Sequence, residues 1–189
     1  LVGSHNFYKP AVNFSINKSN VVTSVSQSLK DSTLETFKIQ KEIHVIPNFI
    51  DFDKVSFDFT DCQRHLMAED DEKIITHVSN LRPVKRIADV IKVFAKVRQQ
   101  VKSKLLIVGD GPDREMASVL AHQLDVRQHI IFLGKSDEVE KILCFSDLFI
   151  LMSKKERFGL GALEAMAYSV PVISTNTGGI PEVNQEGVS

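Results

Sequence analysis

The sequence predicts an α/β fold built on a doubly wound parallel sheet. Short β-rich segments alternate with helical segments from residue 73 to residue 175. Several β-rich segments are apolar along almost their whole length, which is typical of strands buried on both faces of a parallel sheet. Gly, Pro or Asp bounds most of them. Together these observations favour a central sheet with helices packed on both faces.

The predicted strands are short and rich in β-branched or apolar residues. In chain order they are 20–26, 42–47, 73–79, 104–109, 129–134, 147–152 and 170–175. The clearest predicted helix is 84–101, where Ile87, Val90, Ile91, Phe94 and Val97 recur at helical spacing and form one apolar face. Weaker amphipathic patterns predict helices at 113–124 and 137–145, and strong helix formers predict a helix at 160–167.

The order of these elements divides the chain into three parts. Residues 72–189 are expected to form one doubly wound α/β domain. Residues 51–71 are acidic, lack clear periodicity and are interpreted as a linker. Residues 1–50 are too few to bury a core alone and are interpreted as the closing β-α-β part of an earlier domain. The chain is therefore expected to be a fragment of a longer protein.

Composition excludes several classes of protein. The net charge of −1 offers no electrostatic basis for binding nucleic acid or an anionic membrane. There is no signal peptide pattern, and no apolar run approaches the roughly 20 residues that span a bilayer. Cys62 and Cys144 are far apart, which predicts two reduced thiols in a cytoplasmic protein rather than a disulfide or a zinc site.

Ligands of doubly wound sheets bind at the carboxyl ends of the strands, so the loops there are the candidate sites. The loop after 73–79 supplies Arg82, Lys85 and Arg86 where a helix begins, which is either a phosphate site or a solvated helix start. The loop after 104–109 contains Gly109 and Gly111, which permit close backbone approach. In isolation it favours a tight turn, and it lacks the dinucleotide pattern G-x-G-x-x-G.

The loop after 147–152 contains two carboxylates on either side of a helix start. Glu156 precedes Gly159, whose neighbouring amides would be free to bind a diphosphate, and Glu164 lies further into the helix. Carboxylates accept hydrogen bonds from hydroxyl groups, so this combination suits a nucleotide-sugar. The spacing alone favours two surface charges. The paired Gly178 and Gly179 that follow permit a close backbone turn, and the alternative is a surface turn.

A metal-binding alternative rests on the Asp51-Phe52-Asp53 pattern. D-x-D binds metal in another class of sugar transferases, but here it falls in the expected linker and is interpreted as linker charge. The 6 histidines show no i,i+4 pair. No metal and no cofactor are therefore expected.

Taken together, the motifs are more specific than any one of them. "PNFID", "LRPVKR", "LLIVGDGP", "IFLGK", "ERFGLGALEAMAYSVPVIST" and "GGIPEV" occur in the order and approximate spacing of the retaining glycosyltransferases of the GT-B fold, which this chain resembles. The resemblance implies a Rossmann-like C-terminal nucleotide-sugar domain plus the tail of the N-terminal domain.

The resemblance also implies roles for individual residues. Glu156 would contact hydroxyls of the donor sugar, Glu164 would contact the ribose, and Lys85 with Arg82 would bind phosphate. The backbone of Phe158, Gly159 and Leu160 would hold the diphosphate, and Gly134 with Lys135 would hold the uracil. The remaining expected donor-binding residues are Asn80, Gly109 and Gly111, and Asn48 is expected in the interdomain cleft.

The implied reaction transfers N-acetylglucosamine from UDP-N-acetylglucosamine to a small hydroxy acid, L-malate, with retention and without a metal. The fragment alone would bind donor and be inactive. The alternatives are another nucleotide-sugar or acceptor, a donor-binding module without activity, and, less favoured, an oxidoreductase. No nucleic-acid partner is expected, and a homo-oligomer is left open.

Four features depart from the family pattern. Ser79-Asn80 stands where Gly-Arg is common, and Arg157 replaces a small residue. Tyr168-Ser169 stands where Cys-Gly is common, which costs about 1 kcal/mol if that backbone needs a positive φ. Gly161 replaces an apolar residue and is expected to loosen its helix.

Overall fold

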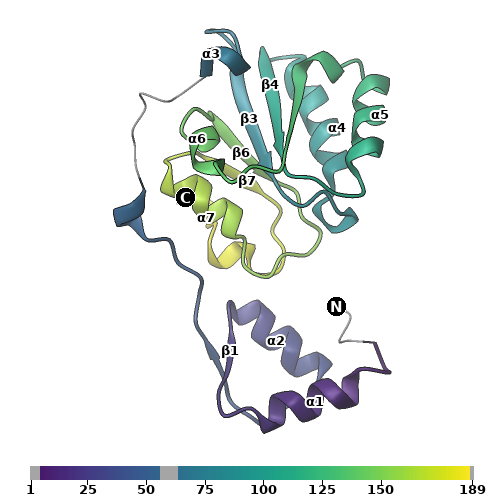
Figure 1. Ribbon diagram of the computed structural model, residues 1–189, viewed down its shortest axis with the longest axis vertical. Helices are drawn as coiled ribbons and strands as arrows, with labels where there is room; N and C mark the ends of the chain where they lie inside the picture. The colour runs from purple at the N-terminus through teal and green to yellow at the C-terminus, as the bar shows by residue number, and fades with distance from the viewer. Residues whose placement is uncertain (1–4, 56–63, 188–189) are drawn as a thin grey trace.

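The computed structural model describes residues 5–55 and 64–187, which form a small N-terminal unit and a larger α/β unit (Figure 1). The N-terminal unit comprises α1 (Lys9–Lys18), β1 (Val22–Ser24), α2 (Gln27–Thr36) and β2 (Ile43–Val45). Its two strands pair in parallel, with Val22 opposite Ile43. The predicted β-α-β order is confirmed, while α1 was not predicted because its apolar residues form no regular stripe.

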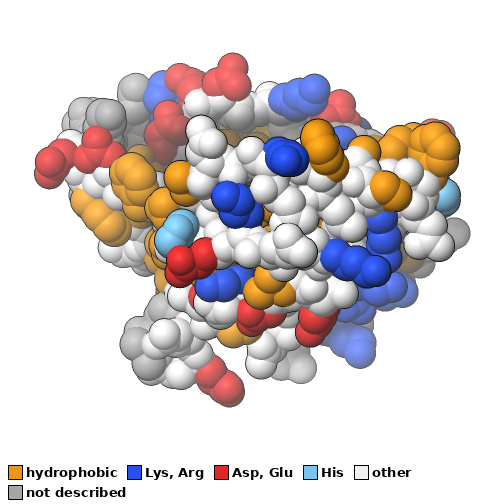
Figure 2. All heavy atoms as spheres, turned by 90° about the horizontal axis from the view of Figure 1, so that it is seen from below, with side chains coloured by type: hydrophobic (Ala, Val, Ile, Leu, Met, Phe, Trp, Pro, Cys, Tyr) orange, Lys and Arg blue, Asp and Glu red, His pale blue; other side chains and the backbone are white. Residues whose placement is uncertain are grey.

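The N-terminal unit buries little of its apolar surface. Neither of its two described helices contains a buried residue. Phe7, Phe14 and Phe49 are 78%, 66% and 83% exposed. In Figure 2, which looks at the molecule from the side of this unit, hydrophobic side chains lie in separate patches among charged ones. The described residues of this unit therefore leave much of its apolar surface exposed, and its interpretation as the closing part of a larger domain stays a prediction.

The larger unit contains a five-stranded parallel sheet in the order β5-β4-β3-β6-β7. Its strands are β3 (Lys73–Val78), β4 (Ser103–Val108), β5 (Ile130–Gly134), β6 (Leu148–Leu151) and β7 (Val172–Ser174). Helices α4 (Ile87–Arg98) and α5 (Arg114–Gln123) cover one face, and α6 (Val139–Leu143) and α7 (Leu160–Ala167) cover the other (Figure 1). This confirms the predicted doubly wound α/β fold.

Alternation along the strands builds a core on each face of the sheet. Ile75, Leu105 and Ile107 pack with residues of α4 and α5. Leu106 and Val108, one position out of step, pack with residues of α6 on the opposite face. Both sets are almost completely buried, which explains why the strands read as continuous apolar runs.

The sheet has its topological switch point between β3 and β6, from which the chain winds outward in both directions. The carboxyl ends of the strands point toward the N-terminal unit (Figure 1). Loops that follow β3 and β6 therefore meet at the edge where ligands bind in this class of sheet.

Most predicted boundaries lie within two residues of those observed, and two larger differences occur. The helix predicted at 84–101 begins only at Ile87, because Arg86 adopts a left-handed conformation with φ 53 after the short turn η4 (Pro83–Lys85). The expected linker contains the turn η2 (Phe52–Lys54) and the helix α3 (Arg64–Met67), while Cys62 lies outside the described residues. Two further short turns are η5 (Arg127–His129) and η6 (Ile180–Glu182).

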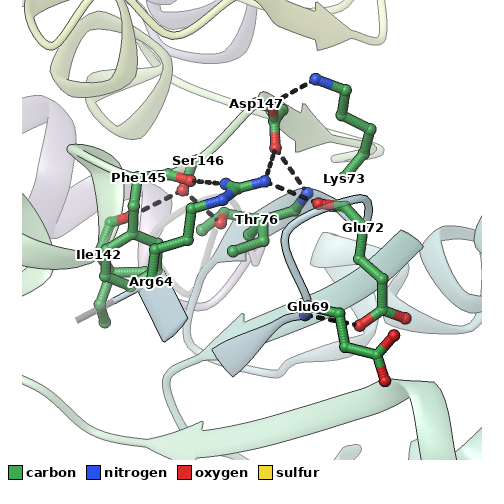
Figure 3. A network of polar contacts seen from close by, with 10 residues as sticks. Arg64, Glu69, Glu72, Lys73, Thr76, Ile142, Phe145, Ser146 and Asp147 are labelled. Carbon is green, nitrogen blue, oxygen red and sulfur yellow. Dashed lines mark hydrogen bonds and ion pairs between the residues drawn. The ribbon is translucent and has the colours of Figure 1, made fainter. Parts of the chain in front are cut away.

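The short helix α3 is fixed to the sheet by Arg64 (Figure 3). Its guanidinium donates to the carbonyls of Phe145 and Glu72 at 2.6 and 2.7 Å and to the Asp147 carboxylate at 2.9 Å. Asp147 also accepts from the Ile74 amide at 2.8 Å and from Lys73 at 3.0 Å.

Across the described ranges, no helix combines the length and apolarity needed to cross a bilayer.

Candidate functional site

Lys85 and Glu156, which lie 71 positions apart in the sequence, meet at the switch point. The Lys85 ammonium donates to Glu156 Oε2, and the Ser153 hydroxyl donates to the same oxygen at 3.1 Å. The Lys154 amide donates to the Val84 carbonyl at 2.8 Å and so joins the two loops. The side chains of Lys85 and Glu156 are 18% and 17% exposed, so this cation and carboxylate form a largely buried pair at the carboxyl edge of the sheet.

The glycine pair after β7 holds the backbone of Glu156. A Cβ atom on Gly178 would lie 1.9 Å from the Glu156 carbonyl oxygen, and one on Gly179 would lie 2.3 Å from the Arg157 carbonyl oxygen. The Gly179 amide donates to the Glu156 carbonyl at 3.1 Å. The sequence left a close backbone turn and a surface turn open here, and the structure shows the close approach that the paired glycines permit.

The α7 helix starts directly beyond Glu156. Gly159 is its N-cap with φ 100, and Phe158 before it is 7% exposed. The amides of Leu160 and Gly161 have no acceptor inside the helix, because the first N–H groups of any α-helix lack one. A Cβ on Gly161 would lie 3.4 Å from the Phe149 ring, an ordinary contact distance, so the packing on β6 does not require glycine at this position. The expected loosening of the helix by Gly161 stays a prediction.

Glu164 lies further along α7 and is half-buried. Burial raises the pKa of the Glu164 carboxyl, and the nearby charge of Glu140 raises it further. A pocket of about 310 Å³ lies against Glu164, and its lining includes Tyr168, Ile50 and Asp51. This carboxyl therefore faces a space bounded by α6, α7 and the segment after β2.

The glycines after β4 serve contacts between loops. Gly109 has φ 116, and a Cβ on it would lie 1.9 Å from the Ser79 carbonyl oxygen. A Cβ on Gly111 would lie 2.5 Å from the Leu81 carbonyl oxygen. The loops after β3 and β4 thus touch through their backbones, and a direct role of these glycines in donor binding stays a prediction.

Sequence reasoning missed His77, which is completely buried in β3. Its Nδ1 lies 2.9 Å from the Ile150 carbonyl oxygen and its Nε2 lies 2.8 Å from Ser79 Oγ. Because a carbonyl only accepts, Nδ1 carries the proton and the Ser79 hydroxyl donates to Nε2. Burial, with the charge of Lys85, lowers the pKa of His77 to about 4 despite the Ile150 hydrogen bond. Neutral His77 therefore orients Ser79, one of the departures from the family pattern.

The remaining predicted residues lie around this edge without a described contact to Glu156. Asn80 and Arg82 are exposed in the loop after β3, and Lys135 is exposed after β5. Gly134 has φ 72, and its carbonyl accepts from the Gly109 amide at 2.7 Å. Asn48 is exposed in the segment after β2. Their roles in binding phosphate, uracil or the interdomain cleft stay predictions.

The described side chains that could bind a metal ion are His, Cys, Asp and Glu. Among these, no group of three or more His, Cys, Asp or Glu residues is placed to hold an ion. Asp51 is the N-cap of η2 and Asp53 lies within it, between the two units. Whether the donor binds without metal stays a prediction for experiment.

Comparison with known proteins gives relatives along the whole chain. It is 45% identical over 189 residues to N-acetyl-alpha-D-glucosaminyl L-malate synthase of Bacillus anthracis, covering 99% of this chain and 49% of that protein. It is 33% identical to an uncharacterized glycosyltransferase of Methanocaldococcus jannaschii, covering 89% of this chain and 45% of that protein. The chain thus spans about half the length of these curated relatives.

Solved structures share the fold. Anabaena HepE, solved with UDP and glucose, has a TM-score of 0.87 at 21% identity and covers 97% of this chain and 52% of its own. A glycosyltransferase from Rickettsia africae has a TM-score of 0.76 at 24% identity and covers 94% of this chain and 50% of its own. The chain shares the GT-B fold of these transferases.

The family model described as "Glycosyl transferases group 1" matches residues 59–189, which include every strand of the five-stranded sheet and the Lys85–Glu156 pair. The chain therefore belongs to the group 1 family of glycosyl transferases.

Proposed function

We propose that the protein transfers N-acetylglucosamine from UDP-N-acetylglucosamine to L-malate with retention of configuration, the first step of bacillithiol biosynthesis, in the cytoplasm. The relative from Bacillus anthracis carries the name of this activity, and its similarity extends over 99% of the chain rather than over the common family motifs alone. In this proposal the chain contributes the donor site.

The observation that carries the proposal is the Lys85–Glu156 pair at the switch point, beside the start of α7. The Lys85 ammonium and the helix N-terminus supply positive charge for the diphosphate of the leaving UDP. The Glu156 carboxylate accepts hydrogen bonds from hydroxyls of the transferred sugar. Glu164, in its pocket on the same helix, accepts from the ribose hydroxyls. Each type of group thus faces the part of the donor that matches its chemistry.

A substitution of Glu156 distinguishes an enzyme from a module that only binds the nucleotide. In the full-length protein, Glu156→Gln should leave the dissociation constant for UDP within about threefold, because UDP lacks the sugar that Glu156 contacts. Transfer should fall by about 100-fold or more, the usual effect of removing one positioned catalytic group. Calorimetry with UDP and a product assay with malate measure the two effects.

Glu115→Gln is the matched control, because it makes the same chemical change at an exposed position on α5. It should leave both quantities unchanged. If Glu156→Gln transfers sugar at the rate of the unmodified protein, Glu156 has been misassigned and the proposed mechanism fails.

Substrate identity requires a separate comparison. Full-length protein should prefer UDP-N-acetylglucosamine over UDP-glucose and GDP-mannose, and L-malate over lipid acceptors. A clear preference for another donor or acceptor would remove the proposed reaction while leaving the chain in its family.

A further inference from the structure

A set of contacts at the start of α2 joins the N-terminal unit to the unit that carries Glu156. The amide of Gln27 donates to Glu182 Oε2 at 2.8 Å, and the amide of Ser28 donates to Glu182 Oε1 at 2.8 Å. Glu182 lies in η6, more than 150 positions along the chain. One carboxylate therefore accepts both leading amides of the helix, where its negative charge also opposes the positive end of the helix dipole.

Ser26 makes the second contact between the units. Its side chain is completely buried, and its Oγ donates to the Arg157 carbonyl at 2.6 Å while accepting from the Leu29 amide at 3.0 Å. A single hydroxyl thus caps α2 and binds the peptide group next to Glu156. Because this hydroxyl donates to the loop and accepts from α2, the position of α2 is coupled to the position of that loop.

Both contacts converge on the backbone that orients Glu156. Gly178 and Gly179 hold the carbonyls of Glu156 and Arg157 from one side, and Ser26 holds the Arg157 carbonyl from the N-terminal unit. The turn η6, which carries Glu182, follows directly from Gly179. A movement of α2 would therefore act on the same loop through Ser26 and through Glu182.

We propose that Glu182 and Ser26 are positioning residues that set the N-terminal unit against the Glu156 loop in the catalytically competent arrangement. This inference rests on the proposed function. Ser26 acts through the Arg157 carbonyl next to Glu156, and Glu182 acts through the two leading amides of α2. We call the contacts of Ser26 with Arg157 and of Glu182 with Gln27 and Ser28 the α2 clamp.

The test compares Glu182→Gln with Glu182→Asp in the full-length protein. Gln has the same size, but its NH₂ group is a donor and would face an amide N–H, so one hydrogen bond and the charge are lost. Asp keeps the charge and both acceptor oxygens. Glu182→Gln should lower kcat for transfer about tenfold, because small displacements of a reacting group reduce rates strongly. Its dissociation constant for UDP should stay within about twofold, and Glu182→Asp should recover part of kcat.

Glu186→Gln is the control, because it removes an exposed carboxylate four positions further along the same segment and should change neither quantity. A wild-type kcat in Glu182→Gln overturns the clamp. A loss of UDP affinity as large as the loss of kcat also overturns it, since that result indicates general disruption of the larger unit.

Hydrogen exchange at the amides of Gln27 and Ser28 tests the clamp independently of catalysis. Glu182→Gln should accelerate exchange of both amides at least tenfold while leaving the amides of β3 unaffected. Unchanged exchange overturns the clamp even if the reaction is as proposed. If Glu156→Gln leaves transfer intact while exchange accelerates as expected, the proposed function fails and the clamp contact stands.

Discussion

Two residues of the larger unit, Ser169 and Glu164, lie in surroundings that are unfavourable for their residue type. Ser169 follows α7 with φ 59, and the amides of Ser169 and Val170 donate to the carbonyls of Met166 and Ala165. This is the Schellman arrangement, in which glycine is preferred at the position of Ser169. Glu164 is an acid whose burial raises its pKa. Substitution of either residue is therefore expected to change the free energy of unfolding of the protein.

Ser169→Gly should raise the free energy of unfolding by about 1 kcal/mol, because glycine adopts positive φ without the steric penalty of a Cβ atom. Chemical denaturation measures the change. Ser19→Gly, the same substitution at the C-cap of α1 where φ is −67, should give no gain. Equal or lower stability of Ser169→Gly would contradict the strain assigned to this turn.

Glu164→Gln should make the protein more stable at pH 7 and weaken its binding of UDP. The folded state holds the Glu164 proton more tightly than the unfolded chain, whose carboxyl titrates near 4.5. The presence of Glu164 therefore lowers stability progressively as pH rises from about 4.5 through its raised pKa. The stabilisation by Gln should disappear below that range, where the carboxyl is protonated in both states. Loss of a hydrogen-bonded carboxylate should reduce UDP affinity about tenfold or more.

Thermal denaturation across pH and calorimetry with UDP measure these effects. Glu140→Gln is the informative companion, because it removes the neighbouring charge that raises the pKa of Glu164. Glu140→Gln should shift the pH dependence of UDP binding toward acid. The phosphate groups of UDP also titrate, but their contribution is the same for the variant and the unmodified protein and cancels when the two are compared. A Glu164→Gln protein that binds UDP normally would remove Glu164 from the donor site.

At the scale of elements, α3 shows how a segment with little propensity is held in place. Arg64–Met67 is too short to be stable as an isolated helix, and Arg64 fixes it through two carbonyls and Asp147 (Figure 3). Burial alone would raise the pKa of Asp147, but hydrogen bonds from the Ile74 amide, Lys73 and Arg64 outweigh burial and lower it. Asp147 therefore stabilises the fold in its charged form.

Asp147→Asn should lower the free energy of unfolding at pH 7 by about 1–3 kcal/mol, the usual range for hydrogen bonds to a charged group. Because the folded pKa lies below the unfolded value of 3.8, this contribution is present above 3.8 and is lost as pH falls through the folded pKa. Denaturation of both proteins between pH 2.5 and about 7 measures the convergence. Asp137→Asn, an exposed carboxylate, is the control. A difference that does not shrink with acid would contradict the assigned role of the charge.

At the scale of the whole molecule, one edge of the sheet combines the candidate chemistry with the contact between units. The switch point between β3 and β6 brings Lys85 to Glu156, and the same edge faces the N-terminal unit. The larger unit has a core on each face of its sheet, whereas the N-terminal unit exposes much of its apolar surface. Donor binding is therefore expected to reside in the larger unit, and transfer is expected to require more than this chain.

The 189-residue chain should bind UDP in calorimetry with equal affinity in the presence and absence of EDTA, and should not transfer sugar to malate. Equal affinity is expected because Lys85 and the start of α7 supply the positive charge that other transferases take from a metal ion. Metal-dependent binding would return Asp51 and Asp53 to consideration. Transfer by the chain alone would contradict the expected need for further residues.

The fold was predictable because a parallel sheet buried on both faces leaves a strong local signal. The apolar runs of β3, β4 and β6 and the stripe of α4 were all recognised. The regions missed have weak patterns: α1 lacks an apolar stripe, and α3 depends on Arg64 reaching distant carbonyls. Of the site, Lys85 and Glu156 were recognised by motif and their contact is observed. His77 and Glu182 were missed because their partners are backbone groups more than 70 positions away, which no local pattern encodes.

By itself the sequence determined the α/β class, the location of the candidate loops after strands, and the family. Periodicity is set by neighbouring residues, and the order of motifs can be followed along the chain without knowing which of them touch. The tertiary structure alone decided which of those loops touch. The switch between β3 and β6 joins Lys85 to Glu156, glycines without Cβ atoms let loop backbones meet, and Ser26 and Glu182 tie α2 to the Glu156 loop. These contacts span most of the chain and depend on how the whole sheet is wound.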